Sequence, residues 1–452
     1  MWVARTRART ARSSPSREPR GATRMTLTIS ITPEIELIDV PRQIRVSGAR
    51  PGNEVTIVAR SSGPGGSVWQ AEATFAADAD GTVDPGRDAP VRGDYAGVSA
   101  MGLIWSQHEA EPATRAKGGA ASVEDVVTEF AVHAGGEEAR AGMTQILATK
   151  GVTRREIIED GVSGVLYMPA TDGPHPGVVI LNGSGGGMNE PRAALYASRG
   201  YAALALGYFR APGLSDWIND VPLEYFRDAF AWFRRSVVLK DDFVAITGQS
   251  RGGELVLLIA ATYPEAVSAV MAYVPASCVH SAQSAGDPAR GRLAATWTLD
   301  GRPLPHLWDG NRTGTYAPYD NGPEPKRHEY ALLTAMADQA AVERARIPVE
   351  KIAAPVLLIN GTDDGWWPTD YHCDLIVERM RGAGRHVERL RFEDAGHSIL
   401  FPYVPTTVIT AAHPVSGIVS TSGGTPAANA RANAESWAGV LDFLNRVQKK
   451  DA

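Results

Sequence analysis

One serine, Ser250, lies inside the segment G-Q-S-R-G-G, between two apolar runs. The preceding letters FVAIT are typical of a buried strand and the following ELVLLIAA of a buried helix, so the chain must turn sharply at this serine. The pattern G-x-S-x-G, from Gly248 to Gly252, matches a nucleophile elbow, in which a strained turn exposes a reactive hydroxyl. We therefore predict that Ser250 is a nucleophile; the alternative is an ordinary serine in a turn.

A serine hydroxyl is a weak nucleophile unless a base removes its proton. Downstream, LLINGTDDGWWP ends one expected strand with two aspartates, and FEDAGHSI ends another with His397. The chain order serine, acid, histidine is that of α/β hydrolases. We predict His397 as the base and later the acid, with Asp364 holding its tautomer and stabilising the imidazolium. Asp363 is interpreted as a turn or solvent residue, and Asp394 as a loop cap.

The chain has ten histidines, so other bases had to be weighed against His397. Only His397 combines a strand end with the correct chain order. The others considered were His372 and His386, expected on surface segments, and His280, His306 and His328, in a glycine- and proline-rich excursion.

An oxyanion that develops on an acyl group needs hydrogen-bond donors already in place. One is expected to be the Arg251 amide, at the start of the helix after the serine. The other is expected from the glycine-rich loop LNGSGGGMNE, and we assign it to Gly185. A phosphate-binding loop fits less well, because the loop lacks a Lys-Ser/Thr ending and a complete G-x-G-x-x-G. A flexible linker is unexpected directly after a buried strand.

The elements that position these residues alternate between apolar strands and helices. Buried strands such as GVVILN, YAALALGY and APVLLING alternate with helical segments in residues 151–452. This alternation predicts an α/β hydrolase domain with a mostly parallel, doubly wound sheet. Residues 276–346 are too long for a simple connection and are expected to form an excursion near the mouth of the site.

Residues 25–150 differ in pattern, because short alternating segments such as EVTIVARS are separated by Gly, Pro, Asn and Asp turns. They predict an all-β, immunoglobulin-like sandwich ahead of the hydrolase domain. Residues 1–24 hold seven arginines against Glu18 alone and lack an apolar core of a secretory signal. We interpret them as a disordered basic leader, or as sequence upstream of a true start at Met25; an organelle transit peptide is the alternative.

Composition excludes several function classes. The net charge of −6 with a basic leader leaves an acidic body, which argues against nucleic-acid binding. No apolar run reaches the length of a membrane span, and no histidine or cysteine spacing predicts a metal site. Two cysteines, Cys278 and Cys373, do not make a disulfide framework, so we expect a reducing, cytoplasmic location. We expect no cofactor.

Taken in order, seven motifs resemble the acyl-CoA thioesterase and bile acid-CoA:amino acid N-acyltransferase family. They are LNGSGGG, YAALALGYF, PLEYFRDAF, ITGQSRGGEL, INGTDDGWW, DAGHSILFPYVP and GGTPAANARANAESWAGVLDFL, with PGNEVTIVA and FAADADGTVD in the front domain. The resemblance covers about Ile31 to Arg446. It implies a Ser250, Asp364 and His397 triad that hydrolyses acyl-CoA through an acyl-enzyme, with coenzyme A entering only as part of the substrate.

The resemblance also bears on the acceptor and the substrate. Conjugating members of that family carry cysteine as the nucleophile, so Ser250 favours hydrolysis over transfer to an amine. Trp366 and Trp367 depart from the family pattern and could reshape the acyl pocket, and Arg251 is the first candidate for contact with the phosphates of coenzyme A. Further arginines near the site segments are Arg192, Arg199, Arg210, Arg234 and Arg235.

Three alternatives remain open from the sequence. The first is a carboxylesterase or dienelactone-hydrolase-like enzyme for oxygen esters, and the second is an acyl-CoA:amino acid N-acyltransferase. The third is a non-catalytic binding protein on a hydrolase fold, although no member of the expected triad is missing. Acyl chain length and oligomeric state have no signal in the sequence.

Overall fold

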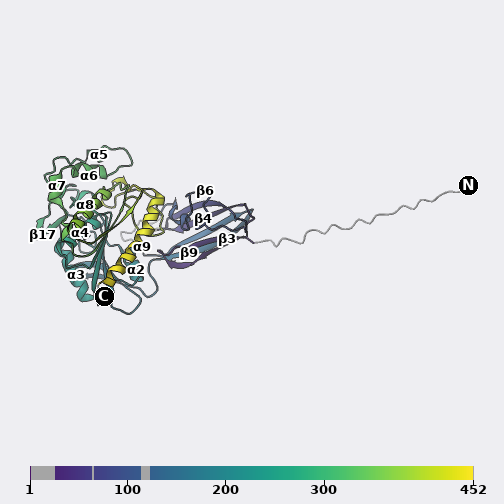
Figure 1. The fold of residues 1–452 in the computed structure, drawn as a ribbon, viewed down its shortest axis with the longest axis horizontal. Coiled ribbons are helices and arrows are strands. Elements are labelled where there is room, and N and C mark those ends of the chain that lie inside the picture. Colours follow the sequence, from purple (N-terminus) through teal and green to yellow (C-terminus); the bar gives the residue numbers. More distant parts are fainter. Residues whose placement is uncertain (2–25, 64–65, 114–122, 451–452) are drawn as a thin grey trace.

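The computed structural model describes residue 1 and residues 26–63, 66–113 and 123–450. The expected basic leader 1–24 lies outside these residues apart from Met1. A β-rich N-terminal part adjoins a larger part in which helices cover a central sheet (Figure 1). In the described part of the chain, no helix has both the length and the apolar character needed to cross a membrane.

The N-terminal part consists of strands whose side chains alternate between the interior and solvent. Strand β4 (Glu54–Ser62) shows the pattern, because Val55, Ile57 and Ala59 are fully buried while their neighbours are not. The larger sheet has the order β2-β9-β8-β4-β5-β6, with β7 also paired to β5, and β1 pairs with β3 separately. The bounds are β1 Thr28–Thr32, β2 Ile35–Leu37, β3 Gln43–Ser47, β5 Val68–Ala76, β6 Arg92–Gly93, helix α1 Gly102–Trp105, β7 His108–Glu111, β8 Val126–Ala134 and β9 Glu137–Ile146.

The two sheets of this part share one hydrophobic cluster. Ile44 and Val46 of β3 pack with Val55 and Ile57 of β4, and Phe75 of β5 belongs to the same cluster. The N-terminal part is therefore a two-layer β unit with one short helix, α1, in the same cluster, and its immunoglobulin-like character stays a prediction.

The larger part is built on an eight-stranded sheet with the order β10-β11-β13-β12-β15-β16-β19-β20. The first two pairings, β10 with β11 and β11 with β13, are antiparallel, and the rest are parallel. The bounds are β10 Thr153–Glu159, β11 Val162–Met168, β12 His175–Leu181, β13 Ala202–Leu206, β15 Leu239–Gln249, β16 Ala269–Tyr273, β19 Val356–Gly361 and β20 Val387–Phe392. The predicted α/β hydrolase fold with a mostly parallel sheet is confirmed.

Helices cover both faces of this sheet, which explains why its central strands are apolar on both sides. One face packs against α3, α4 and α8, and the other against α2 and α9. Their bounds are α2 Glu190–Ser198, α3 Leu223–Ser236, α4 Arg251–Thr262, α8 Thr369–Gly382 and α9 Pro426–Lys450.

The expected excursion is a set of short elements gathered around a separate apolar cluster. Trp308, Tyr316 and Tyr319 pack there with helix α6, and Trp367 from the loop after β19 joins them. The short elements of the excursion are η2 Gln283–Ala285, β17 Trp297–Leu299, β18 Arg302–Pro303, α5 Ala317–Asp320, α6 Glu329–Met336 and α7 Gln339–Ala345. Two further short elements lie outside it in sequence: β14 Val221–Pro222, which pairs with β17, and η3 Val349–Lys351; β17 and η3 pack in the main core. A later hairpin, β21 Thr410–Ala412 with β22 Val419–Thr421, was not predicted.

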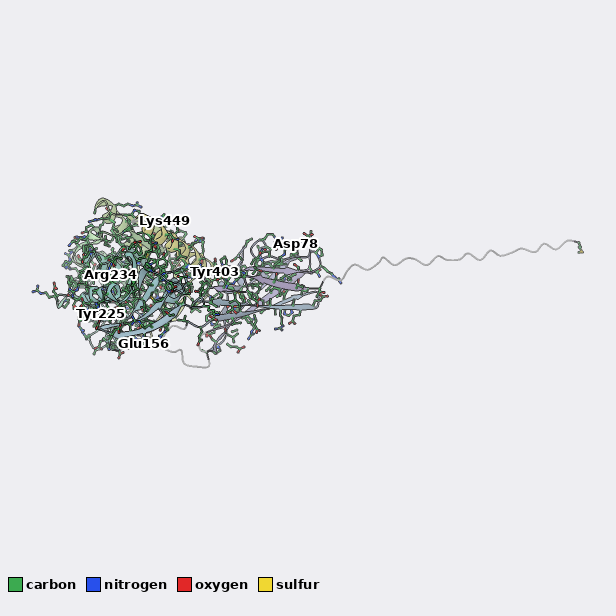
Figure 2. The ribbon with its side chains drawn as sticks, turned by 90° about the horizontal axis from the view of Figure 1, so that it is seen from below. Asp78, Glu156, Tyr225, Arg234, Tyr403 and Lys449 are labelled. Atoms are coloured by element: carbon green, nitrogen blue, oxygen red, sulfur yellow. The ribbon has the colours of Figure 1, made fainter. Side chains whose placement is uncertain are left out.

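Specific contacts join the two parts of the molecule. The carboxylate of Asp39, which is almost completely buried, accepts hydrogen bonds from Arg199 and from Trp437 Nε1. Gln145 of β9 donates to the carbonyl of Tyr403, which lies where the β-rich part meets the larger part in Figure 2. The β-rich part is therefore held against the hydrolase part by specific polar contacts.

Candidate active site

Ser250 lies at the tip of a sharp turn between β15 and α4, as predicted for an elbow. Its backbone has φ 58° and ψ −118°, a conformation that L-residues rarely adopt, and its N–H donates to Tyr273 O at 2.9 Å. The flanking glycines make this turn possible. A Cβ on Gly248 would lie 2.3 Å from Gly252 O, and a Cβ on Gly252 would lie 2.6 Å from Asn182 O.

His397 and Asp364, thirty-three residues apart in sequence, form a hydrogen bond of 2.7 Å between Nδ1 and Oδ2. Asp364 is buried, and three further donors hold its carboxylate: the amides of Trp366 and Trp367 at Oδ1, and Thr369 Oγ1 at Oδ2. The carboxylate is therefore fixed in place and fixes the imidazole with it. Because Nδ1 is engaged, Nε2 is the nitrogen that remains to receive a proton.

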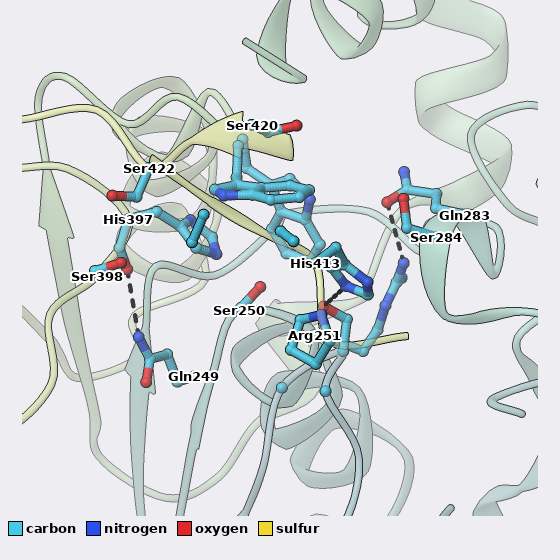
Figure 3. Close-up of a pocket in the computed structure, with 18 of the residues that line it drawn as sticks. Gln249, Ser250, Arg251, Gln283, Ser284, His397, Ser398, His413, Ser420 and Ser422 are labelled. Atoms are coloured by element: carbon cyan, nitrogen blue, oxygen red, sulfur yellow. Dashed lines mark hydrogen bonds between the residues drawn. The ribbon is translucent and has the colours of Figure 1, made fainter. Parts of the chain in front are cut away.

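Ser250 and His397 line one pocket of about 400 Å³. In the view of Figure 3 the Ser250 hydroxyl lies below and between His397 and His413. Within the described part of the chain Ser250 Oγ makes no direct hydrogen bond to His397, and such bonds are commonly long before substrate binds. The structure thus brings the serine to the same pocket as the histidine–aspartate pair.

The other two aspartates considered have structural partners. Asp363 pairs with Arg327 at 2.8 Å and accepts from the Gly424 amide. Asp394 has a positive φ of 58°, and its carbonyl accepts from Thr425 N in a turn. In the described part of the chain, neither of these aspartates forms a hydrogen bond with the His397 side chain.

The two amides expected to form an oxyanion hole lie at the same pocket. Arg251 and Gly185 both line it, and neither N–H has a protein acceptor among the described residues. The glycine loop is held by its own residues: Asn182 Nδ2 donates to Gly186 O at 2.7 Å, and Tyr208 Oη donates to Asn182 O at 2.8 Å. The loop therefore presents its amides from a fixed turn.

Two family models together match most of the length of this chain. Residues 39–159 match the acyl-CoA thioester hydrolase/BAAT N-terminal region, and residues 221–449 match the BAAT/acyl-CoA thioester hydrolase C terminal. The chain belongs to the acyl-CoA thioester hydrolase/BAAT family. The resemblance predicted from the motifs is confirmed, and the protein is an enzyme of this thioester-acting family.

Curated relatives of the family align along almost the whole chain. Acyl-coenzyme A thioesterase 6 of Homo sapiens is 28% identical over 426 residues, covering 90% of this chain and 93% of its own. Mitochondrial acyl-coenzyme A thioesterase 2 of Mus musculus is 28% identical over 440 residues, covering 94% and 90%. Among solved structures, Pyrococcus horikoshii acylaminoacyl peptidase is similar with a TM-score of 0.41 and 13% identity, over 91% of this chain and 60% of that one.

The Arg251 side chain does not reach the mouth of the site. The prediction that it contacts the phosphates of coenzyme A is therefore corrected. The guanidinium is only 1% exposed; it pairs with Glu254 at 2.8 Å and donates to the carbonyls of His280 and Ser281. Burial raises the pKa of Glu254, while Arg251 beside it opposes that rise. Arg251 can serve the site through its backbone amide, but its guanidinium is already engaged by Glu254 and by two backbone carbonyls.

Of the other arginines considered, only Arg210 is both exposed and in contact with the site. Its Nη1 donates to Gly185 O and to Pro414 O, at 3.1 and 3.3 Å, so it bridges the glycine loop and the β21–β22 hairpin. The rest are engaged elsewhere: Arg192 is buried and donates to Leu400 O, and Arg199, Arg234 and Arg235 pair with Asp39, Asp242 and Asp160.

Trp366 lines the pocket as expected, with its ring centroid 6.5 Å from that of His397 and 5.6 Å from that of His413. Its neighbour Trp367 turns into the apolar cluster of the excursion, with its centroid 6.0 Å from that of His397. Both tryptophan rings therefore lie near the His397 imidazole, and both line the pocket.

His372 was expected on the surface, and this expectation is wrong. It is fully buried on α8, where Nδ1 accepts from Ser277 N, and burial lowers its pKa to about 3. Its helix periodicity, four residues ahead of the buried Ile376, is the signal that could have placed it inside.

The sequence analysis did not predict that the β21–β22 hairpin forms one wall of the pocket. It also did not predict the contact between His413 of this hairpin and Ser184. The segment IVSTS and the preceding VITAA alternate weakly around P-V-S-G, which is a hairpin signal in retrospect.

Proposed function

We propose that this protein hydrolyses acyl-CoA thioesters, with Ser250 as nucleophile, His397 as general base and acid, and Asp364 as the carboxylate that orients the imidazole. The observation that carries the proposal is the 2.7 Å hydrogen bond from His397 Nδ1 to a fully engaged Asp364, at the pocket that Ser250 also lines. Membership of the thioester hydrolase/BAAT family and the names of the relatives support the choice of substrate.

Acylation begins when Ser250 Oγ attacks the thioester carbonyl carbon and its proton moves to His397 Nε2. The C–O bond forms, the carbonyl oxygen becomes an oxyanion, and the amides of Arg251 and Gly185 donate to it. The C–S bond then breaks, and the proton on Nε2 goes to the sulfur of coenzyme A. Asp364 stabilises the imidazolium while it carries that proton.

Deacylation repeats these roles with water as the nucleophile. His397 Nε2 removes a proton from water, the hydroxyl adds to the acyl carbon, and the ester bond to Ser250 breaks with return of the proton to Oγ. The products are a free carboxylic acid and the serine enzyme. A serine at position 250 supports hydrolysis over amine transfer, which the family resemblance associates with cysteine.

The phosphates of coenzyme A require a cation at the mouth of the pocket, and we assign this role to Arg210. Its guanidinium is exposed beside the glycine loop, and both carbonyl partners bind Nη1, so Nε and Nη2 have no acceptor among the described residues and can donate to phosphate oxygens. Arg210→Gln should raise the KM for an acyl-CoA several-fold and leave the KM for a p-nitrophenyl ester unchanged. Equal effects on both substrates would contradict this assignment.

A panel of acyl-CoA substrates, followed by release of free thiol, tests the main proposal. Wild type should release coenzyme A, while Ser250→Ala should not and should lose labelling by a fluorophosphonate probe. Turnover of p-nitrophenyl esters without any turnover of acyl-CoA would favour an esterase. A conjugate as the main product when glycine or taurine is added would favour transfer, and absence of labelling in folded wild type would favour a non-catalytic role.

A further inference from the structure

A second histidine, His413, reaches the same pocket from the turn of the β21–β22 hairpin. Its Nε2 lies 2.9 Å from Ser184 Oγ, although the two residues are 229 positions apart in sequence. His413 is only 6% exposed, so this hydrogen bond is largely shielded from water. The mechanism above uses neither residue.

The backbone of the hairpin fixes the tautomer of this histidine. The amides of Val415 and Ser416 both donate to His413 Nδ1, at 3.2 and 3.3 Å. Nδ1 must therefore be the unprotonated nitrogen, and the proton of the neutral ring sits on Nε2. Burial, helped by Arg251 and Arg210, lowers the pKa of His413 to about 4, which keeps the ring neutral near pH 7.

The tautomer of His413 in turn sets the direction of the Ser184 hydroxyl. Because Nε2–H is a donor, Ser184 Oγ must accept this hydrogen bond. Its own hydrogen is then free, and in the described part of the chain no protein group accepts it. A hydroxyl whose lone pair is held by a buried histidine is a ready hydrogen-bond donor to an oxygen in the pocket.

Ser184 also lies close to the reacting centre. It precedes Gly185 in the glycine loop and lines the pocket with Ser250. The loop is packed against the elbow: a Cβ on the neighbouring Gly183 would lie 3.5 Å from Ser250 Cβ. The Ser184 hydroxyl therefore shares the pocket in which the carbonyl oxygen of an acyl group at Ser250 is expected to become negative.

We propose that Ser184 is a third oxyanion donor, through its side-chain hydroxyl, and that His413 is the positioning residue that orients it. This inference rests on the proposed acyl transfer to Ser250 and adds two residues to it. The hydroxyl would donate most strongly in the transition state, when the carbonyl oxygen carries charge, so its loss should lower kcat more than it raises KM.

The test compares four variants and one control on the best acyl-CoA substrate of the panel. Ser184→Ala should lower kcat about tenfold or more, with KM within about threefold. His413→Phe, which cannot donate, should have the same effect, and His413→Gln, whose amide can donate, should recover part of the loss. The double variant Ser184→Ala/His413→Phe should be no worse than the worse single one, because His413 acts through Ser184.

The matched control is Val419→Ala, an exposed residue on strand β22 of the same hairpin that does not line the pocket; it should be close to wild type. A trifluoromethyl ketone that adds to Ser250 as a charged hemiketal provides a second readout. In Ser184→Ala the affinity for this ketone should fall by about the same factor as kcat. If Ser184 had a merely structural role, the affinity for the ketone would not fall selectively. If Ser184→Ala had the same kcat as wild type, the inference would be overturned. It would also be overturned if the fold-loss of kcat in the double variant were the product of the two single losses.

Failure of this inference can be told from failure of the proposed function. If wild type hydrolyses no acyl-CoA, the same series can be run on p-nitrophenyl acetate, since any ester forms an oxyanion on attack. If no ester turns over either, the rate of fluorophosphonate labelling replaces kcat. A reduced rate in Ser184→Ala and His413→Phe supports the inference, and an unchanged rate refutes it.

Discussion

Asp364→Asn is the sharpest test of the catalytic geometry, because every acceptor position of this carboxylate is used. Oδ1 accepts from the amides of Trp366 and Trp367, and Oδ2 accepts from Thr369 Oγ1 and His397 Nδ1. An asparagine has one acceptor oxygen and one donor NH₂. The oxygen must remain at the two backbone amides, which can only donate, so the NH₂ group is forced toward His397.

The consequence for His397 is a change of tautomer. A donor facing Nδ1 requires an unprotonated Nδ1, which leaves the proton on Nε2 and removes the base from Ser250. By the behaviour of Ser-His-Asp enzymes with this substitution, we expect kcat to fall about 10⁴-fold, which is about 5.5 kcal/mol of barrier. Folding should be little affected, because Thr369 Oγ1 can accept from the new NH₂.

The assay is thiol release at saturating acyl-CoA, with fluorophosphonate labelling as an independent measure of serine reactivity. The matched control is Asp363→Asn at the adjacent position, whose carboxylate faces Arg327 and Gly424 and not the histidine. The control should keep kcat within about threefold of wild type. A loss below tenfold in Asp364→Asn, or a larger loss in the control, would refute the reasoning.

Three further predictions concern the framework around the site. Gly252→Ala should lower the melting temperature and the activity, because its Cβ would lie 2.6 Å from Asn182 O; we expect about 2 kcal/mol of lost stability by urea unfolding, and no change would contradict the close packing of the elbow. Arg251→Met should cost about 3–5 kcal/mol in the same assay, because it strands the buried carboxylate of Glu254, whereas a neutral result would mean that the pair is solvated. His372, with its pKa lowered to about 3 in the folded state, stabilises the protein fully above about pH 6.5 and loses that contribution as pH falls toward 3. His372→Gln should therefore flatten the fall of unfolding free energy between pH 6.5 and 4, and an unchanged slope would show that this histidine does not titrate with unfolding.

The strands of the central sheet could be predicted because helices cover both faces, so β13 and β16 are apolar throughout and β12 and β19 are largely apolar. The edge strand β10 could not be predicted in this way. Only one of its seven residues, Ile157, is buried, so TRREIIE carries almost no apolar pattern. Its place in the sheet depends on pairing with β11, which composition alone does not reveal.

The residues of the candidate site also divide into those that could be predicted from the sequence and those that could not. Ser250, Asp364 and His397 could be chosen from local signals, because each follows a strand and the order of chain elements restricts the choice. The burial of Arg251 depends on Glu254 one helical turn later and on carbonyls thirty residues away, and only the first of these is visible in R-G-G-E. The bond between Ser184 and His413 joins two loops with no local signal, so it could be found only in three dimensions.

The structure also gives a reason for the β-rich part to be there. The N–H and Oγ1 of Thr406 donate to Trp105 O, and Thr407 Oγ1 donates to Gln107 O. The next two residues, 408 and 409, line the pocket that holds Ser250 and His397. Because the hairpin that carries His413 begins directly after this point, the β-rich part anchors the wall of the pocket at its base. Loosening this anchor should therefore affect the orientation of His413 before it affects the Asp364–His397 pair, which is held by the central sheet and α8.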